Sequence, residues 1–262
     1  MKRSLGILFS LSVSVIANAQ NISTTLEGYF STSKKDAMYS SVYFDGKGHV
    51  LINDNYAGEY FQKDDYVYVF PDKSVFIFKV DKDKLKGISS WVEKNTYKQA
   101  KIPSNDSVER VFKTYKINPT LLHQWYIQNF KEGTDEISFS VLEDSSKFKN
   151  QMEDLCNKDL AAACGSLFGI NILEAVGGLN ALLDTENRSA VELKPDIKIE
   201  AIARKMINLN DFRGYSLLGS YYMMLGNTEK AKLIYEEGAQ QGDIDSVYAL
   251  FGLNLEEKID VE

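Results

Sequence analysis

The sequence predicts an α+β protein, in which an N-terminal antiparallel β-meander is followed by a C-terminal array of α-helical hairpins, an α-solenoid. Residues 20–98, the expected β-rich domain, are dense in tyrosine and phenylalanine, and their short apolar runs alternate with turn residues. The expected helical domain, residues 99–262, carries the motif Tyr-Ser-Leu-Leu-Gly at 215–219, with echoes at 164–169 and 248–252. Recurrence of this kind is typical of helical repeats.

Residues 1–19 have the features of a signal peptide. Two basic residues follow Met1, residues 5–16 are apolar but too few to span a bilayer comfortably, and residues 17–19 (Ala-Asn-Ala) form a small-residue cleavage site. We expect cleavage here and a periplasmic or secreted mature chain, with an uncleaved anchor as the alternative. No later apolar run approaches about 18 residues, so we expect no integral membrane segment in the mature chain.

The charge balance narrows the choice of partners. The chain has a formal net charge of −7. A nucleic-acid partner needs a basic face that displaces counterions, and an anionic membrane surface also attracts basic segments. We therefore expect neither of them as a partner.

The turn clusters place the expected strands. A Gly46-Lys47-Gly48 hairpin turn separates the first two, and turns then recur about every 8–12 residues, which is the spacing of an antiparallel meander. Trp91 and Tyr97 are expected to pack inward from the last strand. The expected strands are residues 41–45, 49–53, 57–61, 66–70, 75–80 and, near the end of the domain, 89–97.

The strand at 66–70 is apolar on both faces. Successive side chains of a strand point to opposite sides, so Tyr66, Tyr68 and Phe70 share one face and Val67 and Val69 share the other. A curled sheet, a small barrel and a sheet covered by helices all bury two apolar faces, and the pattern does not decide among them.

Helical signals begin after residue 98. Residues 105–107 (Asn-Asp-Ser) can cap a helix that follows them, and Asn118 with Pro119 begins another. Residues 136–142 fit a strand or a helix, and residues 144–156 predict a helix. An apolar stripe at helical spacing follows Pro119 and consists of Leu121, Leu122, Trp125, Tyr126 and Phe130.

The repeats align on three glycines, Gly169, Gly219 and Gly252, at offsets of 50 and 33 residues. The second offset is close to the period of about 34 residues of helical hairpins, and the first implies an insertion, which we place at residues 183–195. The clearest unit is 211–242. Within it we expect Gly219 to allow close helix approach, Gly226 and Gly242 to end helices, and Asn227 to cap the second helix.

This unit resembles the Sel-one-like repeat, a relative of the tetratricopeptide repeat. The family pattern is roughly A-x-x-x-L-G-x-x-Y, then G, then A-x-x-x-Y-x-x-A-A-x-x-G. It matches Ser216-Leu217-Leu218-Gly219-Ser220-Tyr221-Tyr222, then Gly226, then residues 230–242. The sequence departs from the pattern at Gly238, where the family prefers alanine, and between residues 171 and 210.

The same resemblance concerns the two cysteines. Cys156 and Cys164 are spaced C-x7-C, as in the cysteine-rich bacterial branch of the family, where this pair joins the end of one repeat to the start of the next. The resemblance therefore implies a Cys156–Cys164 disulfide, and two free thiols are the alternative. A metal pair is not expected, because the chain has only two histidines and neither is close in sequence.

Catalytic motifs are weak. The S-x-x-K pattern of penicillin-interacting enzymes occurs at Ser31–Lys34 and Ser146–Lys149, but S-D-N and K-T-G do not accompany it. We expect His49 and His123 to be structural or solvated. We therefore expect a protein that is not an enzyme, with no catalytic residue, cofactor or metal.

The predicted function is that of an exported, non-enzymatic protein–protein interaction module. Trp125, Tyr126, Tyr215, Tyr221 and Tyr222 are the candidate partner-binding residues, because aromatic side chains dominate binding hot spots, and core packing is the alternative for each. The resemblance implies an envelope adaptor or a periplasmic immunity protein that neutralises a secreted antibacterial toxin or effector. Two other hypotheses are a cell-wall or β-lactam-active hydrolase and an envelope ligand-binding protein that uses the β-domain.

Overall fold

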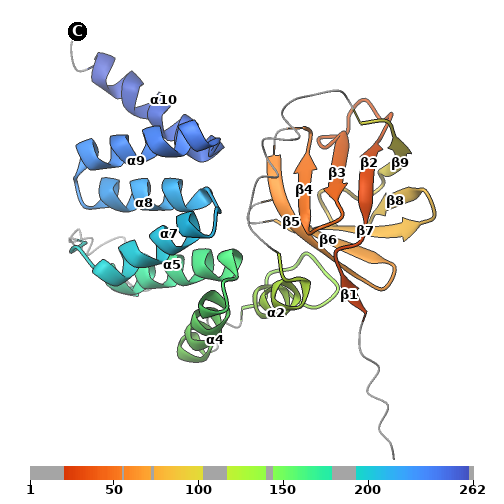
Figure 1. Cartoon of the computed structure of the whole chain (residues 1–262), viewed down its shortest axis with the longest axis horizontal. Helices are drawn as coiled ribbons and strands as arrows, with labels where there is room; N and C mark the ends of the chain where they lie inside the picture. The colour runs from red at the N-terminus through yellow and green to blue at the C-terminus, as the bar shows by residue number, and fades with distance from the viewer. Residues whose placement is uncertain are drawn as a thin grey trace, which may run out of the picture.

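The computed structural model describes residues 21–54, 56–71, 74–102, 117–139, 144–178 and 193–259, with side chains described to residue 254 (Figure 1). The signal peptide predicted at 1–19, the helix expected after residue 107 and most of the insertion expected at 183–195 lie outside these residues. Among the described residues, nine strands precede seven helices.

The strands form a closed antiparallel barrel. Each strand from β2 to β9 pairs with its neighbours in sequence, β9 returns to pair with β2, and the short β1 pairs with β5 outside the closed ring. The strands are β1 (Ile22–Ser23), β2 (Glu27–Ser31), β3 (Ser41–Asp45), β4 (His49–Ile52), β5 (Tyr56–Lys63), β6 (Tyr66–Phe70), β7 (Phe76–Asp81), β8 (Lys84–Gly87) and β9 (Thr96–Ala100).

The predicted β-meander is therefore wrong, and with it the fold class that was built on it. The expected strands did not include β2 and placed the last strand near 89–97. The last strand lies at Thr96–Ala100 and closes the barrel by pairing with β2, where Tyr29 pairs with Ala100. Closure removes both sheet edges and buries one apolar face of every strand. Trp91 is 51% exposed in a turn before β9 and does not pack inward, whereas Tyr97 is fully buried as predicted.

Alternate positions along each strand fill the barrel. Val67 and Val69 lie in the interior cluster, and Tyr68 and Phe70 lie in a second cluster outside the barrel wall, which confirms the predicted division of the strand at 66–70. The other buried interior side chains are Phe30, Val42, Phe44, Val50, Ile52, Tyr60, Phe76, Phe78, Leu85, Val92 and Tyr97. The barrel is thus a packed core.

Helix α2 (Pro119–Asn129) covers the outer wall, as the apolar stripe required. Asn118 caps it by accepting hydrogen bonds from the backbone N–H groups of Thr120 and Leu121. The Tyr126 ring lies 5.0 Å from that of Tyr68, between ring centroids. The same outer cluster continues into α4 (Ser145–Asn157) and α5 (Ala161–Ala175), so the barrel and the first helices share one core.

The helices that follow stack in chain order, with α10 at the end farthest from α4 (Figure 1). They are α7 (Ile197–Asn208), α8 (Arg213–Met224), α9 (Thr228–Gln241) and α10 (Ile244–Ile259). Gly226 and Gly242 have φ of +70° and +94°, the left-handed conformation expected where a helix ends. Asn227 accepts a hydrogen bond from the Lys230 N–H at 3.1 Å, which confirms the predicted cap. No described helix combines the length and apolar character of a membrane crossing.

A charged contact joins α8 to the barrel. The Arg213 guanidinium lies 2.9 Å from Glu59 Oε1 on β5 and 2.5 Å from Asp211 Oδ2 in the turn before α8. The Glu59 and Asp211 side chains are almost completely buried, and that of Arg213 is about one-third exposed. The array is therefore attached to the barrel both through the shared core and through this ionic contact.

Candidate protein-binding surface

The aromatic residues proposed for partner binding pack into cores. Trp125 and Tyr126 are buried against the barrel wall, where Trp125 Nε1 donates a hydrogen bond to Ser166 Oγ at 3.0 Å. Tyr221 and Tyr222 are buried in the cluster formed by α7, α8 and α9, and Tyr215 is partly buried against it. Their positions favour core packing, the alternative given for each, and they do not form one surface.

A different set of apolar side chains is exposed, on α10. Val247, Tyr248 and Phe251 are 47%, 62% and 64% exposed, and their spacing along the helix places them on one side. The opposite side of α10 carries Ser246 and Leu253, both buried against the array. Single exposed apolar residues are ordinary, but three neighbours on one helix face form a patch of the kind found at protein interfaces. We call Val247, Tyr248, Phe251 and the adjacent Gly252 the α10 face.

Comparison with α8 explains the exposure. At the offset of 33 residues, Tyr248 corresponds to Tyr215 and Phe251 to Leu218. On α8 this side is covered by α9, so that Leu218 is fully buried and Tyr215 is partly buried. Among the described residues, no helix covers the same side of α10. The face has the composition of an internal packing surface but lies in solvent.

The segment that carries the α10 face is acidic in sequence. From residue 244 to residue 262 the chain has five acidic residues and one lysine, a net charge of −4. An aromatic face on an acidic segment complements a partner with an apolar stripe and basic residues beside it.

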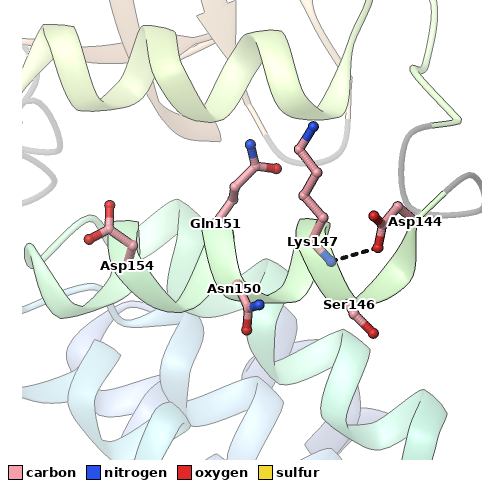
Figure 2. A pocket seen from close by; sticks show the side chains of 6 residues that line it. All are labelled: Asp144, Ser146, Lys147, Asn150, Gln151 and Asp154. Carbon is pink, nitrogen blue, oxygen red and sulfur yellow. Dashed lines mark hydrogen bonds between the residues drawn. The ribbon is translucent and has the colours of Figure 1, made fainter.

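A hollow lies on α4 (Figure 2). It has a volume of about 530 Å³ and a polar lining of Asp144, Ser146, Lys147, Asn150, Gln151 and Asp154. Figure 2 shows Ser146 and Lys147 pointing to opposite sides of the helix, while Asp144 accepts a hydrogen bond from the Lys147 N–H at 2.8 Å. Polar side chains on an exposed helix face account for this hollow.

The lysine of the S-x-x-K pattern at Ser146 pairs with a carboxylate of the next helix. Lys149 Nζ lies 2.5 Å from Glu174 Oε2 on α5. The other match begins at Ser31, on β2, where Ser31 pairs with Ser41 and Lys98 of neighbouring strands.

Both histidines are largely buried, as the structural interpretation requires. His49 Nδ1 lies 2.7 Å from Asp45 Oδ2. Burial alone would raise the pKa of Asp45, but hydrogen bonds from the His49 side chain and from the N–H groups of Lys47 and His49 outweigh it and lower that pKa. His123 packs against Phe61 at a centroid distance of 5.2 Å, and burial, reinforced by the nearby Lys63 ammonium, lowers its pKa.

The two cysteines form a disulfide that joins the end of α4 to the start of α5, so the predicted pairing is confirmed.

Within the described residues, no three histidine, cysteine, aspartate or glutamate side chains are grouped so that they could hold a metal ion. Comparison of the chain with protein-family models, curated proteins and solved structures finds no match. The α10 face is therefore the site on which a function can be argued.

Proposed function

We propose that this chain is a protein-binding module that engages its partner through the α10 face. The observation that carries the proposal is the exposure of Tyr248 and Phe251 side by side on a helix face whose counterpart in α8 is covered. Buried aromatic anchors supply much of the energy of protein interfaces. Burying a large apolar side chain contributes about 1.5–3 kcal/mol, so the two anchors and Val247 can form the energetic centre of an interface that surrounding residues complete.

We further propose that the chain is exported and that its partner is a secreted protein. The disulfide supports export, because such bonds persist mainly in oxidising compartments, and the features of residues 1–19 point the same way. The resemblance to Sel-one-like repeats and the net charge of −7 support a periplasmic immunity protein whose partner is a basic secreted effector.

The alternatives have less support. Side chains fill the interior of the barrel, whereas a ligand-binding barrel encloses a chamber. A hydrolase would need a free amine beside Ser146, and Lys149 is paired with Glu174. Neither alternative rests on an observation as direct as the exposed aromatic pair on α10.

The test is affinity capture from envelope extracts with three folded proteins: wild type, a Tyr248→Ser/Phe251→Ser double variant and an Ile197→Ser control. Ile197 is 84% exposed on α7, so the control removes a still more accessible apolar side chain outside the α10 face. We expect a protein that the wild type and the control retain and the double variant loses. Retention of the same proteins by all three would contradict the proposal.

The immunity hypothesis has a separate test. Cells that produce the wild-type chain should survive delivery of the captured effector, and cells that produce the double variant should not. Equal killing of both strains would remove the immunity part of the proposal and leave protein binding to be decided by the capture experiment.

A further inference from the structure

We infer that the α10 face receives a single basic amphipathic helix of the partner, docked on α10 as α9 docks on α8. The inference rests on the proposed function and specifies the chemistry of the partner. The contact between α8 and α9 shows how such a helix can dock. The faces of α8 and α10 correspond, and among the described helices only the face of α8 is covered.

The α8–α9 contact shows what such an occupant needs. A Cβ atom added to Gly219 would lie 2.4 Å from Cε1 of Tyr235, so the glycine forms a notch that the tyrosine ring of α9 fills. A Cβ atom added to Gly238 of α9 would lie 2.4 Å from Oγ of Ser246 on α10 and 2.6 Å from Cβ of Tyr215 on α8. The occupant therefore brings an aromatic ring to the notch and a small residue opposite the aromatic side chain of the receiving helix.

The α10 face has the same notch, but it is open. A Cβ atom added to Gly252 would meet no described atom within 4 Å, and the adjacent Phe251 and Tyr248 are exposed. Gly169 on α5 is equally open, yet the neighbouring Phe168 is only 4% exposed and offers no aromatic wall. Of the three aligned glycines, Gly252 alone combines an empty notch with exposed aromatic neighbours.

The net charge of the α10 segment and the packing surface that it presents indicate which kind of helix binds there. The α10 face corresponds to the surface by which α8 receives α9, so a helix is the matching shape. The net charge of −4 over residues 244–262 favours lysine and arginine on the flanks of that helix. The same charge opposes a second copy of this chain docking α10 against α10, since each copy carries a net charge of −4 in this segment.

The probe is a labelled peptide with the sequence of residues 227–242, in which Glu229, Glu236 and Glu237 are replaced by lysine. It keeps the ring and the small residue that α9 presents to α8 and supplies the basic flanks. Fluorescence anisotropy with the full chain should show saturable binding that weakens as salt is raised. A second peptide with the additional change Tyr235→Ala should bind at least 10-fold more weakly, because it leaves the notch empty.

The protein variants locate the site. Gly252→Leu fills the notch without a steric conflict in the folded chain and should lower the affinity for the peptide at least 10-fold. Gly169→Leu makes the same change in the equally open position on α5 and should leave the affinity unchanged. Circular dichroism and thermal unfolding confirm that both variants are folded. Equal affinity of wild type and Gly252→Leu, or of the two peptides, would overturn the inference.

The outcomes separate this inference from the proposed function. Capture of a partner that depends on Tyr248 and Phe251, together with no binding of the peptide, overturns the helical partner and leaves the binding module intact. Failure of both experiments overturns the proposed function as well. Sedimentation equilibrium that shows a wild-type dimer, dissociated by Phe251→Ser, would assign the α10 face to a second copy and overturn the inference.

Discussion

Replacement of glycine by alanine should have opposite effects on stability at Gly219 and at Gly252. Gly219→Ala places a methyl group 2.4 Å from the Tyr235 ring, which must move within a packed cluster. Overpacking of this kind costs about 1–3 kcal/mol, and the better helix propensity of alanine returns up to about 1 kcal/mol. We expect a net loss of about 1–2 kcal/mol. Gly252→Ala meets no described atom, so only the propensity gain of about 0.5–1 kcal/mol applies.

Urea unfolding of the two variants and the wild type measures these changes. A change in stability should move the midpoint of the transition and leave its slope unchanged. In thermal unfolding, each kcal/mol corresponds to roughly 2–4 °C for a domain of 150–250 residues. If both variants shift in the same direction, then Gly219 and Gly252 do not differ in occupancy and the reasoning about the open notch fails.

Three further predictions concern the contacts that hold the fold. Arg213→Met should lower the free energy of unfolding by about 3 kcal/mol, measured by urea titration, because the buried Glu59 carboxylate loses a guanidinium partner. The lowered pKa of His123 means that the unfolded chain binds a proton that the folded chain resists, so stability should fall below about pH 6.5; His123→Gln should reduce this slope in urea titrations from pH 5 to 8. Replacing Cys156 and Cys164 by alanine should cost about 2.5 kcal/mol, seen as a lower thermal midpoint, because the short covalent loop no longer restricts the unfolded chain.

Arg204→Met breaks an exposed ion pair with Glu200 within α7 and should cost less than about 1 kcal/mol, so an equal effect of Arg213→Met would contradict a special role for the barrel contact. The lowered pKa of Asp45 reduces stability only below about pH 4, outside the titrated range, so the slope between pH 5 and 8 reports on His123 without a contribution from Asp45. An unchanged slope in that variant would contradict the role given to His123. A double cysteine variant as stable as wild type would contradict the disulfide estimate.

The positions of the central strands could be predicted from the sequence, but the closure of the barrel could not. An open meander and an up-and-down barrel pair the same consecutive strands and have the same turns. They differ here only in the contact between β2 and β9, where Phe30 pairs with Gln99 far along the chain. The apolar character of both faces at 66–70 was the one local signal that the sheet had to close or be covered.

The helix termini were predicted well because their causes are local. Asn118 and Asn227 cap helices through hydrogen bonds to backbone N–H groups two or three residues away. Exposure is not local in this sense. Tyr215 and Tyr248 occupy the same position when α8 and α10 are aligned at an offset of 33 residues, yet one is partly covered and the other exposed, because another helix decides what covers them. The sequence therefore indicated aromatic candidates on α8 and missed those on α10.

The organisation of the core gives the location of the α10 face a physical reason. Phe61, Phe70 and Ile77 of the barrel wall lie in one cluster with residues of α2, α4 and α5, so the barrel anchors the start of the helical array. The Arg213–Glu59 contact adds a second attachment at α8. Leu253 packs α10 into the cluster formed with the preceding helices, and Figure 1 shows α10 at the end of the stack farthest from α4. A face held in this way loses little conformational freedom on binding, which lowers the cost of association with a partner helix.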